Sequence, residues 1–145
     1  MPLEQFFLSP GATRISGDEI LVDFILENPG AGAAAEFFKL GHRRALQCAI
    51  INGACYLALS PATGEIKNAR VVLGAVGPTV IRAVSAEKVL MGEKPSRGLF
   101  LEAGQAAAGD CSPIDDLRGS SDYRQDMIRV LTTRFLSEAY RKIRT

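Results

Sequence analysis

The sequence contains no tryptophan, one histidine and three cysteines, and these scarcities exclude several kinds of functional site. The single histidine, His42, cannot form a histidine cluster around a metal ion and offers no alternative for a histidine-based triad. The cysteines at positions 48, 55 and 111 do not have metal-ligand spacing. Cys48 and Cys55 are an odd number of residues apart in a predicted strand, so they point to opposite faces, and we expect small buried thiols.

Two further absences concern ligands and location. None of the 14 glycines forms the G-x-G-x-x-G or G-x-x-x-x-G-K-[ST] pattern that cradles phosphates. The sequence shows no signal peptide and no apolar run of about 18 residues, so we expect a cytoplasmic protein without a membrane span. The net charge is +1 and the basic residues are dispersed, so no nucleic-acid partner is expected.

What the chain does have is a set of strand patterns in its middle. A chain of 145 residues has room for one domain with one core. Residues 46–59 read LQCAIINGACYLAL, and this apolar run predicts a strand that is buried along most of its length. After the hairpin loop SPATGE, residues 66–76 alternate as a second strand, and residues 80–83 form a short third strand.

The second half of the chain switches to helical periodicity near Val84. We predict a short helix that is capped by Ser85 and stopped at Gly92 in a left-handed conformation. A second helix follows up to about residue 108, and a third begins at Ser120 or Ser121. Its predicted inward stripe is Tyr123, Met127, Val130, Leu131, Phe135, Ala139 and Ile143.

Strands followed by helices predict an α+β fold, with a small antiparallel sheet of three to four strands packed against three helices in two layers. The core of this two-layer sandwich should contain the large apolar residues that the strand and helix periodicities direct inward. These residues are Ile51, Leu57, Val71, Leu73, Leu99, Met127, Leu131 and Phe135.

The N-terminal part carries one further strand pattern. Residues 18–27 read DEILVDFILE and are apolar on both faces apart from Asp23. A lone strand is not stable, so it must dock on the main unit, pair with another copy, or belong to a sheet whose other strands are missing. The Ala-Gly stretch at residues 30–35 is the candidate linker, which divides the chain into residues 1–32 and a domain of residues 33–145. We favour a homodimer across a two-fold axis, because this linker gives the strand reach.

Two polar clusters are candidates for chemistry. Residues 39–44 read KLGHRR and hold Lys39, His42, Arg43 and Arg44. They form either a solvated basic turn or a contact with an anionic or electron-rich group. Residues 115–124 read DDLRGSSDYR. They form either a loop and helix cap, in which Arg118 and Arg124 pair with Asp116 and Asp122, or a paired-carboxylate site for acid–base work.

The stretches KLGHRRA, GAVGPTVIRA and CSPIDDLRGSSDYR, at these separations, resemble one known family. It is the C-terminal domain of the flavin-binding medium subunit of molybdenum hydroxylases, such as carbon monoxide dehydrogenase and xanthine dehydrogenase. The resemblance covers about residues 36–142. Upstream, FFLSPGATRISGDEILVDFIL resembles the last segment of the FAD-binding domain of the same subunit, except that Ser9 stands where glycine is usual.

The resemblance implies a subunit whose FAD passes electrons from iron–sulfur clusters, held by a small subunit, to an external acceptor. It also implies a large subunit that holds the molybdenum cofactor. Leu21 and Lys39 match positions that touch FAD near its isoalloxazine end. His42 and Arg43 match a mobile loop beside the flavin. A cation at Lys39 or Arg43 would favour the reduced anionic flavin.

One departure from the family qualifies this reading. The pyrophosphate-binding loops of the family lie upstream of the residue that matches Met1, so the chain alone is expected to bind FAD weakly or not at all and to be inactive. One hypothesis is therefore the C-terminal part of an electron-transferring FAD subunit, which works with the missing N-terminal FAD-binding portion. The alternative is a non-catalytic assembly or dimerisation module that has lost flavin binding.

Overall fold

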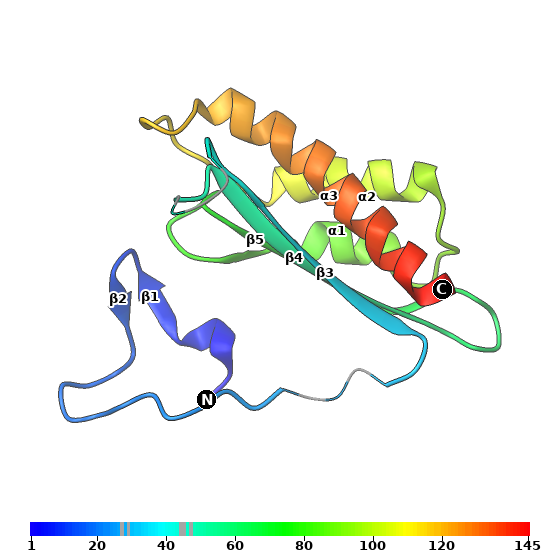
Figure 1. The fold of residues 1–145 in the computed structure, drawn as a ribbon, viewed down its shortest axis with the longest axis horizontal. Coiled ribbons are helices and arrows are strands. Elements are labelled where there is room, and N and C mark those ends of the chain that lie inside the picture. The colour runs from blue at the N-terminus through cyan, green and yellow to red at the C-terminus, as the bar shows by residue number, and fades with distance from the viewer. Residues whose placement is uncertain (27, 29, 44–45, 47) are drawn as a thin grey trace.

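The protein is described by a computed structural model that covers residues 1–26, 28, 30–43, 46 and 48–145. Its core unit has two layers, with three helices on one face of a four-stranded antiparallel sheet, which confirms the predicted α+β fold (Figure 1). The elements are η1 (Leu3–Gln5), β1 (Phe7–Ser9), β2 (Ala12–Thr13), β3 (Ala33–Leu40), β4 (Ile51–Leu59), β5 (Ile66–Gly74), β6 (Ile81–Arg82), α1 (Val84–Leu90), α2 (Arg97–Gly109) and α3 (Ser121–Arg144).

The sheet has the strand order β3-β4-β5-β6, and each neighbouring pair is antiparallel. Side chains of β4 and β5 alternate between its two faces, and the face toward the helices carries fully buried Leu57, Val71 and Leu73. We call the opposite side the outer face of the sheet. Strand periodicity in the sequence therefore predicted the two central strands correctly, because alternation reflects a sheet that is buried on one side.

The edge strand β3 corrects the prediction of a linker at residues 30–35. Ala33–Leu40 forms a continuous ladder with β4, in which Ala33 lies opposite Ala58 and Leu40 opposite Ile51. Alanines carry little strand signal in a sequence, yet they fit a strand whose partner already provides the hydrogen bonds. In the last turn of α3, the Lys142 ammonium lies 2.5 Å from the Glu36 carboxylate of β3. This ion pair fixes the C-terminal end of the helix on the edge strand.

Other strand boundaries also differ from the predictions. The strand predicted from residue 46 begins at Ile51, and the short third strand is confined to Ile81–Arg82. Residue 44 of the predicted basic cluster and residue 47 of the predicted strand lie outside the described residues, as does residue 45 between the cluster and the strand. Cys48 is exposed, whereas Cys55 and Cys111 are buried as predicted, because the chain reaches the sheet only after Cys48.

The strand predicted at residues 18–27 is wrong for its described part. Residues 18–26 have no strand geometry, and residue 27 lies outside the described residues. Ile20, Val22 and Ile25 are 87%, 88% and 92% exposed. An isolated strand cannot satisfy its backbone groups, so apolar alternation alone does not produce one here.

The start of the chain lies on the outer face of the sheet, opposite the helices (Figure 1). Glu4 forms an ion pair with Arg82 at 3.1 Å. Leu3 and Phe7 line a cavity together with Val72 of β5. The first turn of the chain thus folds back on the sheet, while residues 18–26 stay exposed.

Of the two predicted N-caps, Ser120 is confirmed and Ser85 is wrong, and Ser96 is a cap that was not predicted. The hydroxyl oxygens of Ser96 and Ser120 accept hydrogen bonds from the third residue beyond them, at 3.1 and 3.2 Å, and cap α2 and α3. Ser85 is not the cap of α1, which follows Ala83; its hydroxyl instead donates to the Asp110 carboxylate at 2.7 Å. Gly92 has φ of +81°, as predicted for a left-handed stop.

The core lies between the sheet and the helices, and α2 packs on both α1 and α3. The predicted core residues Ile51, Leu57, Val71, Leu73 and Phe135 are buried, but Leu99, Met127 and Leu131 are only partly buried at its edge. The buried face of α3 is rotated from the predicted stripe and comprises Arg124, Ile128, Thr132, Phe135, Leu136 and Ala139. Because α3 contacts both the sheet and α2, its buried face includes two polar residues that hydrophobic periodicity does not show.

Candidate functional site

The two polar clusters of the sequence meet at one end of the domain. His42 lies just after β3, and its Nε2 is 3.0 Å from the backbone carbonyl oxygen of Arg118, in the loop before α3. Ile50, at the end of the same connection, donates its backbone N–H to the Leu40 carbonyl at 2.8 Å and closes the turn. We call the described residues 39–43, 46, 48–50 and 112–120 together the loop end of the domain.

Asp116 organises the second of these segments. Its carboxylate accepts hydrogen bonds from the Arg118 backbone N–H at 2.8 Å, from Arg118 Nε at 2.9 Å and from Arg124 Nη2 at 2.5 Å. Asp116 and Gly119 exchange two backbone hydrogen bonds of 3.2 Å each, which make a tight turn. Arg118 and Arg124 thus both form ion pairs as predicted, but both bind Asp116. Within the described residues, neither arginine forms the predicted pair with Asp122.

These contacts also decide whether the acidic pair can perform acid–base chemistry. Hydrogen bonds from Arg124, and then from Arg118, hold the pKa of Asp116 well below its usual range. The other carboxylate, Asp115, accepts a hydrogen bond from the Ser121 backbone N–H at 2.6 Å. Asp116 is therefore a fixed anion in a structural turn, and the loop-and-cap interpretation holds.

Arg124 is a buried strut that the sequence does not reveal. Its side chain is 3% exposed and joins α3 to the loop after β5, where Nη1 donates to the Ala75 carbonyl at 3.4 Å. Ala75 has φ of +63°, which is unusual for a residue with a side chain. The partners of Arg124 come from two distant loops, and only the tertiary structure brings them together.

Three of the four predicted flavin-site residues lie together at the loop end. Lys39 is exposed on the outer face at the end of β3, and it has no ion pair within the part of the chain that the structure describes. His42 is exposed and engaged with the Arg118 carbonyl, while Arg43 donates to the Leu46 carbonyl. The end of β3 thus presents the Lys39 ammonium next to a connection with two anchored basic side chains, and this arrangement is suited to an anionic or electron-rich group.

Leu21, the fourth predicted residue, lies elsewhere. It is 44% exposed and lines a cavity of about 570 Å³ formed by residues 1–26, together with Phe6, Ile15 and Phe24. Neither Lys39, His42 nor Arg43 lines this cavity. The described structure therefore does not bring Leu21 together with the basic residues.

A second polar network on the sheet fixes the outer face. The buried Glu87 carboxylate of α1 accepts hydrogen bonds from the Val71 backbone N–H at 3.0 Å and from Arg82 at 2.8–3.1 Å. Arg82 also binds Glu4, so this network connects the helix layer, the edge of the sheet and the start of the chain. Sequence reasoning missed Glu87 because a single acidic residue in a short helix normally lies in solvent.

The side chains of the predicted flavin-site residues have a chemistry that suits only part of an FAD molecule, although Leu21 lies apart from the other three. Lys39 can supply positive charge to the electron-rich edge of an isoalloxazine ring, and Leu21 can supply an apolar contact. A diphosphate requires several converging backbone N–H groups or arginines. At the loop end the guanidinium of Arg118 is occupied by Asp116, and that of Arg124 by Asp116 and the Ala75 carbonyl. The chain therefore fits the flavin end of the cofactor better than its phosphates.

The described residues show neither a metal-binding group nor a membrane-spanning helix. Within residues 1–26, 28, 30–43, 46 and 48–145, no three His, Cys, Asp or Glu side chains are grouped to hold a metal ion. In the same residues, no helix combines the length and the apolar character needed to cross a bilayer.

The chain is similar to known proteins along nearly its whole length. Residues 36–139 match the family model described as the CO dehydrogenase flavoprotein C-terminal domain. The chain is 30% identical over 141 residues to the putative xanthine dehydrogenase FAD-binding subunit of Escherichia coli, covering 96% of this chain and 47% of that protein. It is 31% identical over 137 residues to the nicotine 6-hydroxylase medium subunit of Paenarthrobacter nicotinovorans, covering 94% and 46%.

A solved structure shows the same fold. It is a carbon monoxide dehydrogenase from Hydrogenophaga pseudoflava that lacks the Mo-pyranopterin moiety of the molybdenum cofactor. Its matching chain superposes with a TM-score of 0.83 at 29% identity, over 94% of this chain and 47% of that one. The chain thus spans about half the length of the curated relatives that it matches.

Proposed function

The chain belongs to the family of CO dehydrogenase flavoprotein C-terminal domains, and from this premise we propose that it is the C-terminal part of the FAD-binding electron-transfer subunit of a molybdenum hydroxylase. In this role it helps to hold FAD, which takes electrons from iron–sulfur clusters and passes them to an acceptor. The main support is that residues 36–139 match this family while nearly the whole chain superposes on a carbon monoxide dehydrogenase chain.

The basic residues at the loop end are the proposed contribution of this domain. Lys39 places an ammonium, which has no ion pair among the described residues, on the outer face, where it favours a reduced, negatively charged flavin ring. Arg43 adds positive charge, and the hydrogen bond of His42 to the Arg118 carbonyl sets the position of the connection that carries both. The turn around Asp116, held by buried Arg124, makes that support rigid.

The N-terminal residues suggest how the rest of the subunit is arranged. We assign residues 1–32 to the end of an FAD-binding portion and residues 33–145 to the C-terminal domain. The exposed apolar side chains of residues 18–26, which include Leu21, are then covered by the rest of the FAD-binding portion. In this proposal an iron–sulfur small subunit and a molybdopterin large subunit complete the assembly. Support comes from relatives that are named as an FAD-binding subunit and a medium chain, and from a matching structure whose name mentions a molybdenum cofactor.

The proposal is tested by measuring FAD in two proteins. The first is the chain itself, titrated with FAD and followed by flavin fluorescence; it is expected to bind weakly or not at all, because Lys39 and Leu21 do not replace a phosphate site. The second is a chimera in which this chain replaces the matching C-terminal part of the Hydrogenophaga pseudoflava medium chain. It is expected to purify with FAD, and the parent medium chain is measured beside it as the reference.

Controls separate folding from cofactor binding. Circular dichroism verifies that the chimera is folded, and Lys39→Glu in the chimera is expected to lower the flavin reduction potential without loss of fold. A folded chimera that holds no FAD contradicts the proposal and favours the alternative, an assembly module without flavin. Stoichiometric, tight FAD binding by the chain alone contradicts the assignment of the phosphate site to the other portion.

A further inference from the structure

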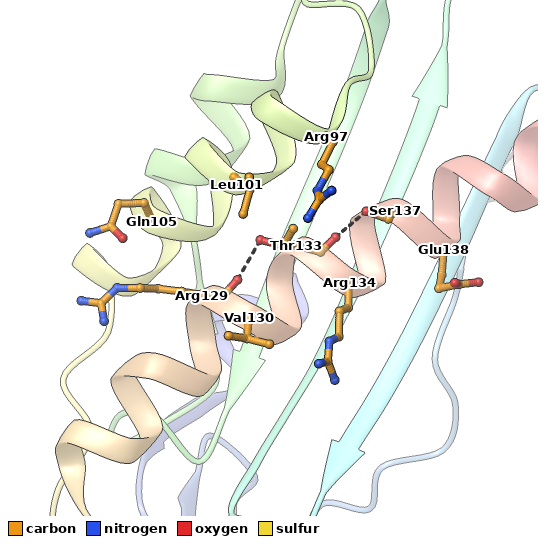
Figure 2. Close-up of a pocket in the computed structure, with 9 residues that line it drawn as sticks. All are labelled: Arg97, Leu101, Gln105, Arg129, Val130, Thr133, Arg134, Ser137 and Glu138. Atoms are coloured by element: carbon orange, nitrogen blue, oxygen red, sulfur yellow. Dashed lines mark hydrogen bonds between the residues drawn. The ribbon is translucent and has the colours of Figure 1, made fainter.

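A groove of about 700 Å³ runs between α2 and α3, on the side of the helices away from the sheet (Figure 2). Three arginines line it, Arg97 from α2 and Arg129 and Arg134 from α3, against a single carboxylate, Glu138. This groove is distinct from the proposed flavin site, since no residue of the loop end lines it.

The positive charge of the groove is largely uncompensated. Arg97 and Arg134 form no hydrogen bond or ion pair with any residue that the structure describes. The Nη1 of Arg129 donates a hydrogen bond to the Asp126 carboxylate at 2.7 Å. Its Nε is buried and has no hydrogen-bond partner among the described residues. The carboxylate of Glu138 is already bound by Arg141 at 2.7 Å. The groove therefore suits an occupant that brings carboxylates.

The middle of the groove is apolar and offers few further donors. Leu101 and Val130 lie between the arginines and are 54% and 38% exposed. The hydroxyls of Thr133 and Ser137 donate to carbonyls of their own helix, at 2.9 and 2.7 Å. An extended peptide would find few acceptors here for its backbone N–H groups, because the lining is mainly arginine and apolar side chains and Glu138 is bound by Arg141. A helix satisfies its own backbone groups.

The spacing of the basic groups defines the occupant further. Figure 2 shows Arg97 reaching toward α3 at one end, and the Arg129 guanidinium beside Gln105 at the other. Arg97 and Gln105 are eight residues apart on α2, or about 12 Å at the rise of an α-helix. An α-helix covers the same length in about seven to eight residues, with its apolar side chains three or four residues after the first acid.

We propose that this groove docks an acidic amphipathic helix of another polypeptide, which lies on α2 and α3 as an additional helix. Two carboxylates of this helix, seven residues apart, pair with the guanidinium groups of Arg97 and Arg129. The guanidinium of Arg134 adds a third positive charge. Leucines between them cover Leu101 and Val130. This inference goes beyond the proposed flavin role and does not depend on it.

The probe is a fluorescein-labelled 18-residue helical peptide with glutamates seven positions apart and two leucines between them. Fluorescence anisotropy at low ionic strength is expected to show saturable binding to the chain. Arg97→Glu with Arg134→Glu, both at exposed positions, is expected to weaken binding by about tenfold or more. The same double variant is expected to bind a peptide with lysines in place of the two glutamates.

The matched control is Arg14→Glu with Arg144→Glu, which changes the net charge equally at exposed positions outside the groove. It is expected to change affinity by about twofold at most, and Leu101→Gln is expected to weaken binding with no change of charge. Equal weakening by the two double variants, or no saturable binding to the unmodified chain, would refute the proposal. Sedimentation showing a dimer that the groove variants abolish would instead assign the groove to a second copy.

Discussion

Replacing Gly104 with alanine is expected to destabilise the domain, although alanine is the better helix former. Gly104 lies in the middle of α2, at a position where the helix packs tightly against α3. A Cβ atom at this position would lie 2.6 Å from the Arg129 carbonyl oxygen and 2.7 Å from Thr133 Oγ1. Both are well inside ordinary contact distance, and the carbonyl belongs to the rigid backbone of α3.

Two opposing effects set the magnitude. Alanine gains about 1 kcal/mol over glycine within a helix. Overpacking a tight contact costs about 1–3 kcal/mol, and here the helices must separate along a seam that also buries Ala103 and Ala107. The shift also disturbs the hydrogen bond from Thr133 to the Phe100 carbonyl at 3.2 Å. The expected net result is a loss of about 1–2 kcal/mol in the free energy of unfolding.

Gly109 is the matched control, because it lies in the same helix and a Cβ there would meet nothing within 4 Å. Gly109→Ala is expected to raise the stability by up to about 1 kcal/mol. Urea unfolding followed by circular dichroism at 222 nm measures both variants. A Gly104→Ala protein at least as stable as the unmodified chain would show that α2 and α3 are not in contact at this position.

Three further predictions follow from burial, charge and exposure. Leu136→Ala, at a fully buried position, should cost about 2–5 kcal/mol in urea unfolding, and Leu131→Ala, at a partly buried one, about half as much; equal costs would contradict the observed rotation of α3. Because the folded pKa of Asp116 is lowered, its ion pairs should stabilise the protein at neutral pH, and this contribution should be lost progressively as the pH falls from the ordinary aspartate pKa of 3.8 through the lower folded pKa. Asp116→Asn should therefore lose less stability on acidification than the unmodified chain, and parallel pH curves would count against this. If residues 18–26 form a homodimer interface, the full chain is expected to sediment as a larger species than a version that starts at Ala33. If both versions sediment as monomers, these residues are not an interface between copies and would be covered by a different partner.

The candidate site shows what sequence reasoning could and could not reach. The basic residues Lys39, His42 and Arg43 stand out as a cluster, and family resemblance assigns them to a flavin. The contact of His42 with the Arg118 carbonyl, 76 residues away, has no local signal. The same holds for Arg124, whose partners Asp116 and Ala75 lie in different loops. Local patterns report which residues are polar, but not which polar residues will meet.

The sequence by itself determined the two central strands, the helices α2 and α3, the Ser120 cap of α3 and the two-layer class, because periodicity and capping are local consequences of one-sided burial and helix ends. Only the tertiary structure decided that alanine-rich Ala33–Leu40 is a strand and that residues 18–26 are not. Strand formation depends on a neighbour that offers hydrogen bonds: β4 provides that neighbour for Ala33–Leu40. Residues 18–26, for all their apolar alternation, form no strand in the described chain.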